Sequence, residues 1–405
     1  MAEKICFIIM GFGRKTDFAT GNTFDLDKTY KHIIRPAVAK AGYRCVRAHE
    51  IPESGFIDKS MYALLIQADL VIADISTYSP NAIYELGIRH AVRPFSTIII
   101  KEKNIGEIPF DLDRTRMFTY SHLGEDLLAE EIMRSVNGLS GLISKVAEKK
   151  LMDSPLYEFM YDITPPRISD EEFESIIGDL EHKEKNIFTI IDKARQHMQD
   201  GDFDNACKCW EKASHAVPDE AYFIQQLAFA KYKSKKPSAG IALMDALVTI
   251  EALHPTNDPE TLGLTGAIYK NMYLNSGDVQ YLNRAIDYYG KGFKISQTYY
   301  TGENYALCLN MKAALENEGD EKIYYTIEAN KSREKVLELL EEKTLTEDFE
   351  QRADKKWMFA TLAHCYYSLK DKRTHHFEKK FLGAADDWER STYVRSKEEI
   401  GKYIY

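Results

Sequence analysis

The stretch ADLVIADISTYSPNAIYELGIRHA, residues 68–91, decides the fold of the N-terminal part. Its apolar, β-branched beginning is typical of a buried strand in a parallel sheet. A polar loop follows, and Pro80 suits the start of a helix, which we predict over residues 81–92 with Glu85 in its first turn. In open α/β sheets, ligands bind outside the carboxyl ends of the strands. The stretch therefore predicts a ligand-binding crevice, and the carboxylates of Asp74 and Glu85 are expected to face it.

Strand-like and helix-like segments alternate through the first 120 residues. Such alternation predicts βαβ units, and hence a parallel sheet with helices on both faces. The predicted strands are residues 4–10, 43–48, 69–74, 96–101 and 117–120, and the predicted helices between them are residues 25–41, 57–67 and 81–92. A further helix is expected over residues 124–150. The expected α/β domain spans residues 1–150.

The pattern of strand-like and helix-like segments changes after this domain. Pro155, Pro165 and Pro166 mark residues 151–168 as a linker, and residues 169–405 contain no strand alternation. Residues 187–220 match a 34-residue tetratricopeptide unit, in which small residues let two helices approach closely and a proline ends the second helix. The matching residues are Ala194, Gly201, Ala206, Trp210, Ala213 and Pro218. Residues 169–405 are therefore predicted to form an all-α solenoid of helix pairs, closed by a capping helix.

Composition limits the class of protein. The chain has 405 residues, of which 44% are apolar and 29% charged, as in ordinary soluble proteins of two or three domains. A formal net charge of -10 argues against a general nucleic-acid or anionic-membrane surface. The six cysteines are scattered without metal-ligand spacing, so we expect neither a metal site nor disulfides. With no leader pattern and no apolar span, the expected location is the cytoplasm.

Further candidate ligand contacts lie beside the two acids. A glycine pair follows the first strand, and its backbone amides can approach a phosphate, although the loop lacks a complete dinucleotide or P-loop motif and equally suits a simple tight turn. Hydroxyl and amide side chains of the loop before residue 85 can hold sugar hydroxyls, and arginines can hold a phosphate with two hydrogen bonds. The candidate substrate-binding residues are Gly11, Phe12, Gly13, Arg14, Arg47, Ser76, Ser79, Asn81 and Tyr84.

Several motifs resemble those of a known architecture. They read MGFG at residues 10–13, RAHE at 47–50, ADIS at 73–76, NAIYELGIRHA at 81–91 and IPFDL at 108–112. This set resembles bacterial proteins that place such a domain before tetratricopeptide repeats, and the TRAF-binding regulatory region of the apoptosis-signal-regulating kinases. Two residues depart from the usual pattern: Gly11 stands where proline is usual and His49 where aspartate is usual.

The same block is similar to nucleoside 2-deoxyribosyltransferases and, more distantly, to TIR domains that hydrolyse NAD. This resemblance implies a flavodoxin-like or TIR-like fold and cleavage of an N-glycosidic bond. It makes Glu85 the nucleophile at the sugar C1′, or the carboxylate that stabilises its positive charge, and makes Asp74 a ligand of ribose hydroxyls or a proton-transfer group. A carboxylate near C1′ fits the charge of a glycosyl transition state.

Two functions remain open at this stage. The first is an N-glycosidic enzyme acting on NAD, a nucleotide or a (deoxy)nucleoside, without a separate cofactor, and regulated by the repeats in stress or antiviral signalling. The second is a non-catalytic nucleotide sensor or protein-docking scaffold. Asp74 also suits a turn cap, and Glu85 a favourable position in the helix dipole. In both cases we expect the repeats to bind a protein partner or to self-associate.

Overall fold

The computed structural model describes residues 4–17, 22–47, 59–105, 112, 117–123, 126–150, 152–160, 162–218, 220–316, 319–347, 349–352 and 354–404. The chain forms two compact units, Met1–Ala230 and Lys231–Tyr405. The first unit contains the sheet and the first helical hairpin, and the second unit contains helical pairs. The motif residues 48–50 and 108–111 lie outside the described residues.

A five-stranded parallel sheet forms the centre of the first unit, with the strand order β4-β1-β5-β6-β7. Its strands are β1 (Ile5–Ile9), β4 (Arg44–Val46), β5 (Leu70–Asp74), β6 (Thr97–Glu102) and β7 (Met117–Tyr120). Numbered along the chain within this sheet, the order is 2-1-3-4-5, which is the flavodoxin-like order. The direction of winding reverses between β1 and β5, so the carboxyl ends of these strands form the switch point where such folds bind ligands.

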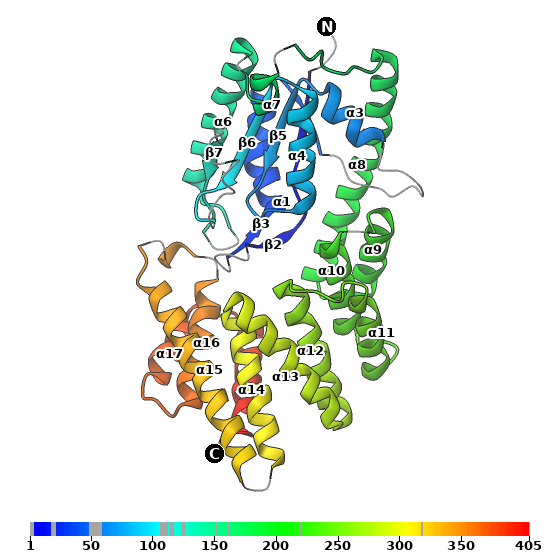
Figure 1. Ribbon diagram of the computed structural model, residues 1–405. Coiled ribbons are helices and arrows are strands. Elements are labelled where there is room, and N and C mark those ends of the chain that lie inside the picture. Colours follow the sequence, from blue (N-terminus) through cyan, green and yellow to red (C-terminus); the bar gives the residue numbers. More distant parts are fainter. Residues whose placement is uncertain are drawn as a thin grey trace. The chain divides into compact units, whose positions relative to one another are not determined.

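Alternate side chains of the buried strands enter two separate cores. Phe7 and Ile9 pack with helices α3 (Lys59–Gln67) and α4 (Pro80–Val92), whereas Ile8 packs against the other face of the sheet. That second face is covered by α2 (Arg35–Lys40) and α6 (Ala129–Lys149), as Figure 1 shows for α4 and α6 on opposite sides of the strands. A parallel sheet buried on both faces explains why its strands read as continuous apolar runs.

One long helix joins the sheet to the first repeat. Helix α8 (Asp170–Gln199) begins with Ser169 as its cap, and Phe173 near its start packs in the core beneath α3. Its last turns pair with α9 (Phe203–Ala216), and Gly201 adopts a φ of +73° in the turn between them. Thirty residues make this helix about 45 Å long, so it reaches from the sheet to the first tetratricopeptide hairpin within the same unit.

The repeats continue as successive helices. The short helix α7 (Pro155–Phe159) precedes α8, and α10 (Ala221–Ser234) follows the first hairpin. The second unit contains α11 (Ala239–Glu251), α12 (Pro259–Ser276), α13 (Val279–Ser296), α14 (Tyr299–Leu315), α15 (Asp320–Thr344), a short 3-10 turn (Phe349–Gln351), α16 (Lys355–Ser368), α17 (Thr374–Ala384) and α18 (Asp387–Gly401). Asp386 forms a capping box with Glu389 at the start of α18, where we expected the capping helix.

The structure adds details that the sequence did not indicate. A two-stranded antiparallel hairpin, β2 (Arg14–Thr16) with β3 (Thr23–Asp25), follows the glycine loop. The helix expected over residues 25–41 contains a π-helical stretch, Tyr30–Ile34, between α1 (Leu26–Thr29) and α2. Helix α6 begins at Ala129 rather than at residue 124. The two compact units divide within the repeats, after Ala230, whereas the predicted domains divide where the α/β pattern gives way to helices. The predicted domain boundaries stay predictions.

Candidate functional site

Asp74, at the carboxyl end of β5, is buried in a hydrogen-bonded network. Tyr120 donates its hydroxyl to Asp74 Oδ2 at 2.6 Å, and the backbone N–H of Ser76 donates to Oδ1 at 2.9 Å. The Ser76 hydroxyl also donates to Oδ1. Burial raises the pKa of the Asp74 carboxyl, and the hydrogen bonds from Ser76 and Tyr120 act in the opposite direction. Asp74 is 5% exposed. Because its carboxylate accepts hydrogen bonds from Ser76, it holds the turn between β5 and α4.

This network continues to the next two strand ends. The backbone N–H of Glu102 donates to Ser76 Oγ at 2.8 Å, and the Glu102 carboxylate accepts the backbone N–H of His122 at 3.2 Å. The ring of His122 contacts the Thr29 hydroxyl at 3.1 Å. Burial raises the pKa of Glu102 and lowers that of His122 to about 4, which leaves the imidazole neutral. The carboxyl ends of β5, β6 and β7 are therefore joined by one buried polar network.

The glycine loop after β1 is covered by side chains of α8 and α10. The Phe12 ring is buried and lies 5.6 Å from the Phe223 ring and 6.2 Å from the Phe188 ring, measured between centroids. Gly13 has a φ of +60°, and a β-carbon added there would lie 2.4 Å from the ring of Tyr222. Only glycine permits both this backbone conformation and this close approach. The surface that was predicted to cradle a phosphate is occupied by side chains of α8 and α10.

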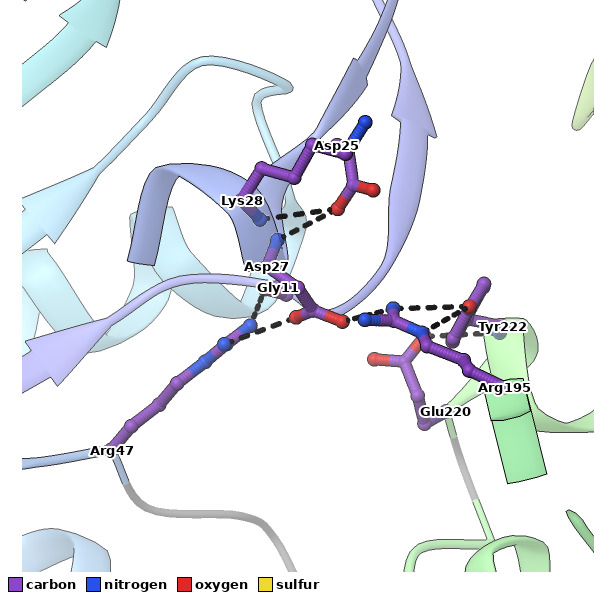
Figure 2. A network of polar contacts seen from close by, with 8 residues as sticks. All are labelled: Gly11, Asp25, Asp27, Lys28, Arg47, Arg195, Glu220 and Tyr222. Atoms are coloured by element: carbon purple, nitrogen blue, oxygen red, sulfur yellow. Dashed lines mark hydrogen bonds and ion pairs between the residues drawn. The ribbon is translucent and has the colours of Figure 1, made fainter. Parts of the chain in front are cut away.

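Asp27 joins the sheet to the first repeat through two arginines (Figure 2). Its Oδ1 accepts from Arg47 at 3.1 Å, and its Oδ2 accepts from Arg195 of α8 at 2.6 Å. Arg47 also donates to the carbonyl of Gly11, and Arg195 donates to the hydroxyl of Tyr222 at 3.1 Å. Burial alone would raise the pKa of Asp27, but the two guanidinium charges lower it below its usual value. We call Asp27, Arg195 and Tyr222 the latch.

Arg47 is buried and makes internal contacts. Its side chain is fully buried, and its guanidinium carbon lies 3.9 Å from the centre of the Phe12 ring and 4.9 Å from that of Tyr30. These rings provide cation–π contacts in a desolvated setting. A separate ion pair joins β2 to the residue directly before α10, since Lys15 Nζ lies 2.7 Å from Glu220 Oε1. Arg47 thus stabilises the loop from inside.

The other predicted site residues lie nearer the surface. Glu85 is half-buried and lies in the second turn of α4, not in the first turn as predicted. Asn81 is exposed, and Tyr84 is 56% exposed with its hydroxyl 3.5 Å from that of Tyr62. Ser79 is half-buried at the start of α4 and makes no side-chain cap. Arg14 is exposed at the start of β2, and Gly11 is half-buried.

The structure thus separates the candidates into two sets. One set is buried in internal contacts and consists of Phe12, Gly13, Arg47, Asp74 and Ser76, and the other is wholly or partly accessible and consists of Gly11, Arg14, Ser79, Asn81, Tyr84 and Glu85. Sequence reasoning missed Asp27, Arg195 and Tyr222. A signal existed only for Asp27, which lies in the first turn of the helix that Asp25 caps, but an acid in that position is explained equally well by the helix dipole.

Arg89, on the same helix as Glu85, has a structural role. Its guanidinium donates to the carbonyls of Leu65 at 2.7 Å and of Ala68 at 3.2 Å, which end α3 and precede β5. Burial lowers the pKa of Arg89 to about 9. The arginine fixes the position of α4 against the sheet, and hence that of Glu85.

Two absences concern only the described part of the chain. There, no three or more His, Cys, Asp or Glu side chains are grouped so that they could hold a metal ion. None of the described helices has both the length and the apolar character that crossing a membrane requires.

Comparison with known proteins addresses the helical part. The family described as Tetratricopeptide Repeats-Sensor matches residues 202–309. The helical part is of the tetratricopeptide type. A solved structure of a thermophilic tetratricopeptide protein from Thermus thermophilus is 16% identical with a TM-score of 0.37, and the match covers 52% of this chain and 97% of that one. No curated protein matches the chain. The resemblances of the N-terminal domain stay predictions.

Proposed function

We propose that this protein is a regulatory scaffold, in which the repeats bind a protein and the α/β domain binds a nucleotide-class ligand at its switch point. The latch is the observation that carries this proposal. Its Arg195 joins α8 to Asp27 of α1, and its Tyr222 packs against Gly13 of the loop after β1. Flavodoxin-like sheets bind ligands at this end of the strands. A partner that displaces the first hairpin therefore changes access to the ligand site.

The direction of this coupling follows from the contacts. Tyr222 occupies the space next to Gly13, and Phe12 is buried among aromatic rings of α8 and α10. A phosphate cannot approach the backbone amides of this loop while those rings are in place. Ligand binding and the latch therefore compete, and any state that opens the latch favours the ligand.

A panel of NAD, AMP, ATP and deoxyadenosine tests this proposal by calorimetric titration. Arg195→Gln removes the ion pair of the latch with Asp27. Its matched control is Arg134→Gln, which removes an exposed ion pair between Arg134 and Glu131 of α6. We expect at least one of the four compounds to bind Arg195→Gln about fivefold or more tightly than it binds the wild type, since coupling free energies are typically about 1–3 kcal/mol. If none of the four binds either protein, or if the two affinities are equal, the proposal is refuted.

A second candidate function is cleavage of an N-glycosidic bond, and the position of Glu85 favours it. Its helix follows the switch-point strand, and the carboxylate is half-buried, unlike that of Asp74. In this reaction the Glu85 carboxylate attacks the sugar C1′ as the bond to the base breaks, or stabilises the positive charge that develops there. Asp74 holds the β5–α4 turn in this version and acts as a positioning residue.

Release of free base distinguishes the two functions. The wild type and Glu85→Gln would be incubated with NAD, nucleotides and deoxynucleosides, and the free base followed by chromatography. The enzymatic version predicts release by the wild type and a loss of about 100-fold or more in Glu85→Gln. An absence of base release in the Arg195→Gln background, in which the latch is weakened, would reject this version and leave the scaffold.

A further inference from the structure

Helix α11 of the second unit carries a row of exposed apolar side chains. Ile241, Met244 and Val248 are 50%, 46% and 68% exposed. They are separated by three and four residues, so they lie on one face of the helix. The opposite face is already buried in the repeat core through Leu243 and Ile250. We call the exposed row the α11 surface.

Helix α15 carries a second row of the same kind. Ile323, Tyr324 and Ile327 are 57%, 60% and 48% exposed, and their spacing places them on one face near the start of the helix. The core contacts of α15 are made by other residues, among them Ala329 and Val336. We call this second row the α15 surface. Large apolar side chains that gather on an exposed face indicate an interaction site.

The two surfaces are bordered by opposite charges. Residues 231–248, which include the approach to α11, contain four lysines and one aspartate, and Lys235 and Lys236 are exposed directly before the helix. Residues 320–328 contain three acids and one lysine, and Asp320 and Glu321 are exposed in the first turn of α15. Each surface thus has an apolar row with charges at the amino end of its helix. A parallel arrangement of the two helices would place the lysines beside the acids.

We propose that the α11 surface of one copy of this protein binds the α15 surface of a second copy. The complementary charges at matching ends of the two apolar rows identify another copy as the occupant. This contact joins two different surfaces, so each copy keeps one surface free and further copies can add. The inference rests on the proposed role of the repeats in protein binding and names one partner for them.

Sedimentation velocity of the full chain tests the contact as the protein concentration is raised. Ile241→Glu places an acid in the α11 surface, Ile323→Lys places a cation in the α15 surface, and Val394→Glu changes an equally exposed valine of α18 as a control. We expect the wild type and Val394→Glu to associate, and each surface variant alone to remain a monomer. A mixture of the two surface variants should give a dimer and nothing larger, because one intact surface remains on each. All four chains should have the same circular dichroism spectrum.

Three results would overturn the inference. The first is a wild type that stays a monomer at every concentration and at low salt, where charge pairing is strongest. The second is association that neither surface variant reduces. The third is a mixture of the two variants that contains no dimer. None of these results alters the nucleotide titration, so failure of this inference is distinguishable from failure of the proposed function.

Discussion

The close approach of Tyr222 to Gly13 predicts a large effect of Gly13→Ala on stability. The new methyl group would lie 2.4, 2.5 and 2.6 Å from three carbons of the Tyr222 ring, whereas carbon atoms in contact are about 3.5–4.0 Å apart. The φ of +60° adds about 1–2 kcal/mol for any residue with a β-carbon. Overpacking adds about 1–3 kcal/mol. The expected loss in the free energy of unfolding is therefore about 2–5 kcal/mol.

Gly42→Ala separates these two contributions. Gly42 has a φ of +80°, but a β-carbon there would have no atom within 4 Å, so this variant carries the backbone cost alone, about 1–2 kcal/mol. Replacing Trp357 and Trp388 by phenylalanine leaves Trp210, which packs 5.7 Å from the Tyr222 ring, as the reporter in urea unfolding. In a Tyr222→Ala background, Gly13→Ala should cost no more than Gly42→Ala. Equal costs of the two glycine changes in the native background would refute the reasoning.

Three further predictions concern charge and catalysis. Asp27→Asn leaves two arginines without their shared carboxylate and should lower the free energy of unfolding, measured in urea, by about 3–5 kcal/mol. Because the pKa of Asp27 is lowered in the folded protein, the wild type should also lose this stabilisation as the pH falls below 3.8, and the variant should show no such loss. His122 has a pKa of about 4 in the folded protein, against 6.5 for the free group, so the unfolded chain binds the proton more tightly. The free energy of unfolding should therefore fall by up to about 3 kcal/mol as the pH is lowered from 6.5 to about 4. His122→Gln should reduce that fall, and an unchanged pH profile would contradict the assignment. Asp74→Asn keeps the size of the side chain but makes Tyr120 and Ser76 compete for a neutral acceptor; we expect about 1–3 kcal/mol of destabilisation and, if base is released at all, less effect on that release than from Glu85→Gln.

Local patterns predicted the strands and helices well because each of them depends on nearby residues. The apolar run before Asp74 and the proline at residue 80 define β5 and α4 to within one residue of the structure. The tetratricopeptide pattern around Trp210 and Ala213 is likewise confirmed by α8 and α9. The order of the five strands makes the switch point a property of the fold, and the stretch that opened the sequence analysis lies at it.

The environment of the candidate site could not be predicted, because it depends on residues far apart in the chain. Arg195 is 168 residues from Asp27, and Tyr120 is 46 residues from Asp74. No spacing rule connects such pairs. The three-residue strands of the β2–β3 hairpin are also too short to produce a visible alternation. Sequence reasoning therefore predicted the strand and the helix at the switch point, and missed that the glycine loop there is covered by side chains of α8 and α10.

The affinity of NAD and the three other compounds for the wild type and for Arg195→Gln tests the central claim most directly. The latch competes with a ligand at the switch point, so at least one compound should bind Arg195→Gln about fivefold or more tightly, while Arg134→Gln should match the wild type. Equal affinities of the wild type and Arg195→Gln for every compound would contradict the account.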